Sequence, residues 1–227
     1  MDKIKKSEKK EEEFAGKTTI TTNYLHKYEM KVFNWLTPRI PKWLTTKRLT
    51  LMSLLWSGLV ILFYWLASKD ANWIWLTSLI LFLHWITDGI DGNVGRYRNE
   101  GFVKWGFYMD HLLDYVFMCC VIVGMGLLAP GISYTIMIMA LIGLFFVHSF
   151  LGFAATNKFR NTFLRVGATE LRILVIGLNG LFYFVQLKYL SWGAPTIIVG
   201  LSALLIYIII KQQKELHNLD MEAKNKK

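Results

Sequence analysis

The sequence has little of what several classes of protein require. Cysteine occurs only twice, at Cys119 and Cys120, which are neighbours inside an apolar stretch. Such a pair supplies neither a disulfide framework nor a thiolate metal site, and we interpret both as small packing residues. Charged residues make up only 19% of the chain while hydrophobic residues make up 54%. This composition excludes a disordered chain and a soluble globular domain.

Acidic residues are scarce as well. The chain has 16 Asp and Glu against 26 Lys and Arg, a net charge of +10, yet its mean hydropathy is +0.35. The basic residues concentrate in both end segments and in turns beside apolar runs. They therefore indicate membrane topology and contact with anionic lipid rather than binding of nucleic acid. The polar N-terminus has no apolar core of a cleavable signal peptide, so we expect the first span to direct insertion.

Apolar blocks of about 20 residues predict an all-α integral membrane fold with six transmembrane helices. We place them at 49–67, 72–95, 105–128, 131–155, 168–189 and 193–210. An even number of spans, with Lys and Arg at alternate turns, predicts that both termini and the active site are cytoplasmic. The chain shows no internal repeat, which argues against a transporter built from inverted repeats.

The spans divide the chain into four segments. These are a disordered charged tail at 1–17, an amphipathic juxtamembrane segment at 18–48, a six-helix domain at 49–210 and a basic cytoplasmic tail at 211–227. In the second segment Tyr28, Val32 and Trp35 recur at helical spacing, which predicts an amphipathic helix. That helix lies either in the membrane interface or against the cytoplasmic face of the protein itself.

Four carboxylates lie where an apolar span should have none. Asp88 and Asp91 are three residues apart and share one face of the second span, and Asp110 and Asp114 are four apart on the third. A short turn makes these spans antiparallel neighbours, so the two pairs can face each other near the cytoplasmic surface. A charged carboxylate within the bilayer costs at least about 2–3 kcal/mol, so the cluster needs compensation.

A cation is the simplest compensation for this cluster. Four converging negative charges repel one another unless a cation lies between them. Oxygen ligands alone favour a hard divalent ion, Mg²⁺ or Mn²⁺, and two such ions suit phosphoryl transfer. We therefore predict Asp88, Asp91, Asp110 and Asp114 as metal ligands. The alternative is a proton or sodium path, in which the Asp cluster belongs to a cation-coupled transporter.

Glycine and arginine accompany the aspartates. Gly92 and Gly106 would let the phosphates or base of a ligand approach the backbone, and the Arg96 guanidinium can bind phosphate oxygens. Gly89 and Gly95 allow the same interpretation, although glycines in membrane helices also serve packing alone. Because an ion path explains neither these glycines nor Arg96, the combination favours an enzyme.

The same residues resemble the signature of the CDP-alcohol phosphotransferase family, D-x2-D-G-x2-A-R, a spacer and G-x3-D-x3-D. The chain matches it at Asp88, Asp91, Gly92, Arg96, Gly106, Asp110 and Asp114. Gly95 stands where the family usually has Ala, and the spacer is slightly longer than usual. The resemblance implies six transmembrane helices after an amphipathic helix, usually in a homodimer.

The resemblance also implies a chemistry. An alcohol attacks the β-phosphate of a CDP-linked donor and CMP leaves, a step of phospholipid synthesis. Asp88, Asp91 and Asp110 would hold a pair of metal ions, and Asp114 would share one ion or accept the proton of the acceptor hydroxyl. Asp88 would also contact the CDP phosphates, with Gly92, Arg96 and Gly106. His111 would move a proton or bind the diphosphate.

Two substrate pairs fit the sequence. CDP-choline or CDP-ethanolamine with diacylglycerol fits a resemblance of segment 43–50 and of His111 to the choline/ethanolamine phosphotransferase branch. CDP-diacylglycerol with a small polar alcohol fits the short chain and the basic turn 157–167. That turn, with Glu170 and Arg172 beyond it, is either a pocket for a phosphorylated alcohol or lipid headgroup, or an ordinary cytoplasmic turn. It contains Lys158, Arg160 and Arg165.

Overall fold

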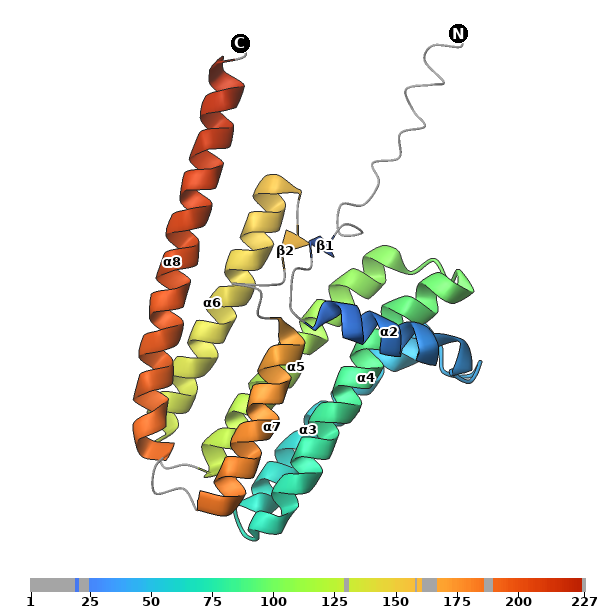
Figure 1. Ribbon diagram of the computed structural model, residues 1–227, viewed down its shortest axis with the longest axis vertical. Coiled ribbons are helices and arrows are strands. Elements are labelled where there is room, and N and C mark those ends of the chain that lie inside the picture. The colour runs from blue at the N-terminus through green and yellow to red at the C-terminus, as the bar shows by residue number, and fades with distance from the viewer. Residues whose placement is uncertain are drawn as a thin grey trace.

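Six long apolar helices make up most of the chain (Figure 1). The computed structural model describes residues 19–20, 25–128, 131–157, 159–160, 167–185 and 190–225. All six are long and apolar enough to cross a membrane, which confirms the predicted fold class. The only strands in these ranges are β1 (Thr19–Ile20) and β2 (Phe159–Arg160), a two-residue parallel pair. The predicted tail at 1–17 lies outside the described residues.

The helices follow the predicted spans closely, with one difference at the end of the chain. They are α3 (Thr46–Ala67), α4 (Ile74–Arg98), α5 (Val103–Leu128), α6 (Ile132–Thr156), α7 (Ala168–Val185) and α8 (Leu190–Asn225). A 3₁₀ turn, Ala71–Trp73, leads into α4. The last span was predicted to end at residue 210, but α8 continues well beyond it, because the Lys, Gln and Glu residues that follow the apolar span are good helix formers in water.

The amphipathic helix α2 (His26–Leu36) lies across the bundle rather than along it (Figure 1). Phe33 is buried against α4, whereas Tyr28, Val32 and Trp35 are exposed. The packing of α2 on the protein is thus observed, and the location of its other face in the membrane interface stays a prediction. One face of α2 packs on the protein, and the other presents the apolar surface expected of an interfacial helix.

Polar contacts fix the segment that joins α2 to α3, which includes the 3₁₀ turn Thr37–Arg39. The Arg98 guanidinium donates to the carbonyl oxygens of Ile40 (2.6 Å) and Leu44 (2.7 Å). The Glu100 carboxylate accepts from the Thr46 backbone N–H (3.0 Å), one of the unpaired donors at the start of α3. The turn between α4 and α5 thereby holds the N-terminus of α3.

The core lies between α3, α4 and α5, and both apolar packing and hydrogen bonds attach α7 to it. Tyr64, on α3, is fully buried and donates to Asn179 Oδ1 on α7 (3.0 Å). The Asn179 amide donates in turn to Ser78 Oγ on α4 (3.1 Å), and Trp85 Nε1 donates to Thr169 Oγ1 (3.0 Å). Interhelical hydrogen bonds are worth about 0.6–2 kcal/mol each in a membrane. Together they fix α7 against α4.

A close approach between α2 and α4 generates a first prediction. A Cβ atom added at Gly89 would overlap with the Phe33 ring, whereas one added at Gly58, on the exposed side of α3, meets no atom within 4 Å. Gly89→Ala should therefore push α2 away from α4 and destabilise the protein by about 1–3 kcal/mol, the usual cost of overpacking. Thermal unfolding in detergent measures this. Gly58→Ala, the matched control, should be neutral or stabilising, and equal melting of the two variants would contradict the packing role of Gly89.

Candidate active site

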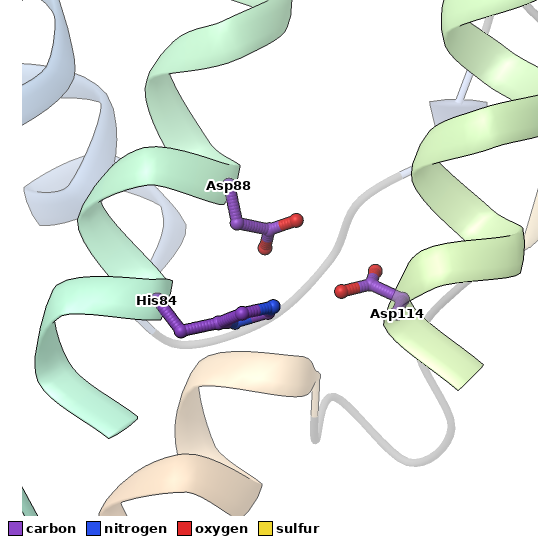
Figure 2. Close-up of side chains that lie close together, drawn as sticks. All are labelled: His84, Asp88 and Asp114. Carbon is purple, nitrogen blue, oxygen red and sulfur yellow. The ribbon is translucent and has the colours of Figure 1, made fainter. Parts of the chain in front are cut away.

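Helices α4 and α5 bring the four aspartates of the spans together. Electrostatic interactions connect Asp88 with Asp110 and Asp114, and Asp91 with Asp88 and Asp110. Figure 2 shows Asp88 and His84 one turn apart on α4, with Asp114 opposite them on α5. One ligand atom from each of these three residues lies within 4.8 Å of the others. The two helix faces that the spacing predicted thus meet in the structure.

Arg172, on α7, is the cation at the centre of this cluster. Its Nη2 donates to Asp88 Oδ2 (2.8 Å) and to Asp114 Oδ1 (3.3 Å). The side chain is only 10% exposed. A buried arginine that bridges two partly buried carboxylates compensates charges that would otherwise repel each other. The hydrogen bonds between α4 and α7 hold the arginine at this depth.

His84 completes the same group. Its ring is fully buried and stacks on Phe117 with 3.6 Å between ring centroids. The Nδ1 atom lies 3.1 Å from Arg172 Nη2. Because a guanidinium can only donate, Nδ1 accepts and the ring proton lies on Nε2, which has no hydrogen-bond partner among the described residues. His84 is therefore both a packed ring and a polar partner of the cluster.

Asp91 is held from α3. The Thr50 hydroxyl donates to Asp91 Oδ2 (2.6 Å), and the Gly92 backbone N–H donates to Oδ1. Thr46 Oγ1 donates to the Asp91 backbone carbonyl (3.2 Å). Asp91 and Thr50 are almost fully buried. Two donors to one buried carboxylate fix its rotamer, so α3 determines the direction in which Asp91 points.

The two aspartates on α5 have His111 beside them. Asp110 Oδ2 lies 3.4 Å from His111 Nδ1, and the Asp110 side chain is 31% exposed. Asp114 is 28% exposed and also interacts with His111. Both carboxylates therefore remain accessible to a ligand, in contrast to Asp91.

The glycines divide into two kinds. A Cβ at Gly106 would meet no atom within 4 Å, and one at Gly92 would meet only the Arg96 guanidinium, at ordinary contact distance. The backbone at both positions is open to a ligand. Gly89 packs on Phe33, and a Cβ at Gly95 would lie 2.8 Å from Thr46 Oγ1. These two are packing residues, the alternative that the sequence left open.

Two further predicted residues lie outside the cluster. The exposed Arg96 donates to Asn93 Oδ1 (2.6 Å) on its own helix. Glu170 accepts from the backbone N–H groups of Gly167 (2.9 Å) and Leu25 (3.2 Å), and so ties the start of α7 to the start of α2. Lys158 and Arg165 of the predicted basic pocket lie outside the described residues, as does the side chain of Arg160.

A cavity of about 370 Å³ opens beside the carboxylates. Its polar end is formed by Asp88, Asp110, His111, Asp114 and Arg172. The rest of its wall is mostly apolar and comes from α5, α6, α7 and α8, with Phe117, Phe145 and Leu204 among the lining residues. It fits a molecule that is apolar along most of its length and polar at one end.

The donor atoms of the site suit a divalent ion. Ligand atoms of two carboxylates, Asp88 and Asp114, and of the His84 imidazole lie within 4.8 Å of one another. Asp91 and Asp110 interact electrostatically with this group. Carboxylate oxygens are the ligands that Mg²⁺ and Mn²⁺ prefer. Charge supports the fit, since four aspartates face a single buried arginine within the described part of the cluster. The site can hold an anionic, phosphate-bearing group only if further positive charge enters with it.

Sequence reasoning missed two residues of the site. Arg172 was noted only as a neighbour of Glu170, although a lone arginine inside an apolar span signals an acidic partner, and the other spans supplied four. Thr50 carried no comparable signal, because threonine is common in membrane helices, where its hydroxyl can bond to its own backbone.

A profile of the family described as CDP-alcohol phosphatidyltransferase matches residues 39–212, which covers most of the chain and all six spans' apolar cores. No curated protein is similar enough to count as a relative.

The contact between Thr50 and Asp91 yields a second prediction. Thr50→Val keeps the size of the side chain but removes the hydroxyl that orients Asp91, and should weaken binding of Mn²⁺ by about 10–100-fold, as losses of such outer partners do. Thr50→Ser keeps the donor and should bind nearly as the natural protein does. Titration of the purified protein with Mn²⁺, followed by electron paramagnetic resonance of the free ion, measures both. Equal affinities of the valine and serine variants would contradict the orienting role.

Proposed function

The chain belongs to the CDP-alcohol phosphatidyltransferase family, and from this premise we propose the reaction that its site performs. The family is a transferase family of phospholipid synthesis. In the proposed reaction a substituted phosphate group moves from a CDP-linked donor to an alcohol, and CMP leaves. The observation that carries the proposal is the apolar cavity that ends at Asp88, Asp110 and Asp114, because it places a lipid next to carboxylates able to manage phosphate chemistry.

We further propose that the lipid in this cavity is the acceptor. Asp114, the predicted base, lines the cavity. Of the four predicted phosphate contacts, Gly92, Arg96 and Gly106 do not line it, and Asp88 lies where the cavity ends. This division favours a polar CDP-linked donor, such as CDP-choline or CDP-ethanolamine, on the Gly92 side. A diacylglycerol would then lie in the cavity with its hydroxyl toward Asp114. CDP-diacylglycerol with a small polar alcohol is the opposite arrangement.

The residue roles follow from position and chemistry. Asp88, Asp91, Asp110 and Asp114 would hold Mg²⁺ or Mn²⁺, which when bound would neutralise the diphosphate and the charge that develops on the leaving CMP. Asp114 accepts the proton of the acceptor hydroxyl as its oxygen forms the new bond to the β-phosphorus. The bond from that phosphorus to the CMP oxygen breaks. Asp110 would hold a metal ion and help to orient the donor phosphate, and His111 would hydrogen-bond the diphosphate or relay the proton.

The open backbone and the exposed guanidinium on α4 define the donor side. Gly92 and Gly106 leave room for the diphosphate beside the helices, and Arg96 can turn from Asn93 to a phosphate oxygen. We place this side, with both termini, on the cytoplasmic face, where Lys and Arg concentrate. We also propose that two copies of the chain form a homodimer, as the sequence resemblance implies.

Release of CMP from defined substrates tests the function and the pairing together. The purified chain in liposomes with Mg²⁺ or Mn²⁺ should release CMP from CDP-choline or CDP-ethanolamine only when diacylglycerol is present. Ile142→Trp fills the cavity from α6 and should raise the KM for diacylglycerol at least about tenfold, as tight apolar pockets discriminate by size. The KM for the donor should stay the same.

Ile136→Trp is the matched control, since Ile136 lies on the same helix, is 54% exposed and does not line the cavity. CMP release only from CDP-diacylglycerol with a polar alcohol would reverse the assignment of the cavity. Absence of CMP from every donor, together with metal-driven ion flux across the vesicles, would overturn the transferase itself.

The role of Asp114 is tested separately from binding. Asp114→Asn removes the proton acceptor and should lower turnover by about 10²–10⁴-fold, the usual contribution of a general base. Binding of the CDP donor should remain, because Asp88, Asp91 and Asp110 are intact. Equilibrium binding of the labelled donor distinguishes this variant from Asp91→Asn, which should lose the donor. If both variants lose it equally, Asp114 acts only as a ligand.

A further inference from the structure

We propose that Arg172 occupies the place of a divalent cation between Asp88 and Asp114, and that its guanidinium leaves these carboxylates when the cation binds. Arg172 is then a positioning residue that holds the ligand set together before loading and competes with the cation for it. The inference rests on the proposed function only in taking the aspartates as metal ligands.

The position of a single nitrogen atom carries the argument. Arg172 Nη2 lies 2.8 Å from Asp88 Oδ2, 3.1 Å from His84 Nδ1 and 3.3 Å from Asp114 Oδ1. Ligand atoms of these same three residues lie within 4.8 Å of one another (Figure 2). Arg172 Nη2 therefore lies among the candidate ligand atoms for a metal ion.

Arginine and a divalent ion cannot share this place. Mg²⁺ binds oxygen at about 2.0–2.1 Å and needs the lone pairs that Nη2 now uses. Two positive centres at contact distance also repel strongly where little water screens them. Binding of the ion to Asp88 and Asp114 thus requires that the guanidinium withdraw from both.

The surroundings allow the side chain to move while its helix stays. Other hydrogen bonds hold α7 to α4, from Trp85 to Thr169 and from Asn179 to Ser78, and neither involves Arg172. Arg172 also lines the cavity of about 370 Å³, which gives the guanidinium room beside the carboxylates. Arginine has a long flexible stem, so the change needs side-chain rotation only.

Competition has a consequence for the order of binding. The arginine stabilises the protein without metal, because four acids close together in a membrane need a cation. The same arginine weakens binding of the cation, because its hydrogen bonds to Asp88 and Asp114 must first be broken. An anionic phosphate of the bound donor that pairs with the released guanidinium would offset this loss, so cation and phosphate-bearing substrate should each favour binding of the other.

Mn²⁺ affinity of the purified full-length chain in detergent, without substrate, tests the proposal. Arg172→Gln should bind Mn²⁺ on the order of 10–100-fold more tightly than the natural protein, since charge-assisted hydrogen bonds no longer have to be broken. Its thermal stability should be lower without metal and should rise more when Mn²⁺ is added. Arg172→Lys keeps the charge without the planar fork and should bind with intermediate affinity.

Two controls assign the effect to this site. Arg39→Gln removes the same charge from an exposed arginine that contacts Trp35, and should leave Mn²⁺ affinity unchanged. Asp88→Asn, alone and combined with Arg172→Gln, should abolish the tight binding, which shows that the ion is bound at the cluster.

The outcomes separate this proposal from the function on which it rests. Equal or weaker Mn²⁺ binding by Arg172→Gln, with an unchanged helical circular dichroism spectrum, would overturn the competition and make Arg172 an orienting partner of the ligands. If Arg172→Gln folds only with Mn²⁺ present, the exchange of one cation for the other is supported directly. Absence of Mn²⁺ binding in the natural protein and in every variant would instead overturn the metal site, and with it the proposed function.

Discussion

Compensation of negative charge inside the membrane is the constraint on which the rest of the structure depends. Four aspartates converge where lipid surrounds the bundle, and each would be costly alone. Different partners compensate the charges of the different aspartates. Arg172 bridges Asp88 and Asp114, while Thr50 and the backbone N–H of Gly92 hold Asp91. Asp110, whose side chain is 31% exposed, has His111 beside it.

The helices that carry these partners are joined by hydrogen bonds as much as by apolar packing. A lipid environment offers little hydrophobic force between helices, so buried polar contacts contribute an unusual share of the specificity. The series from Tyr64 through Asn179 to Ser78 connects α3, α7 and α4 in the membrane core. A helix fixed in this way can present an arginine at a defined depth. The geometry of the site therefore depends on hydrogen bonds that lie outside it.

The sequence predicted the fold and part of the site for physical reasons that also explain its failures. Length and hydropathy define spans because the bilayer has a fixed thickness, and the i, i+3 and i, i+4 spacing places the aspartates on facing sides of α4 and α5. Those patterns are local. The contact of Arg172 with Asp88 joins residues far apart in the chain, and whether Gly89 faces a ligand or Phe33 depends on where α2 lies. Neither could be derived from periodicity alone.

The position of α2 has a mechanical consequence. At one end its backbone is tied by the N–H of Leu25 to Glu170, two residues before Arg172, and in its middle Phe33 presses against Gly89, the residue after Asp88. A helix whose other face is apolar and exposed thus rests on both elements that carry the opposite charges of the site. The two contacts couple α4 and α7 mechanically through α2, so a tilt of α2 would change the gap between the helices that carry Asp88 and Arg172.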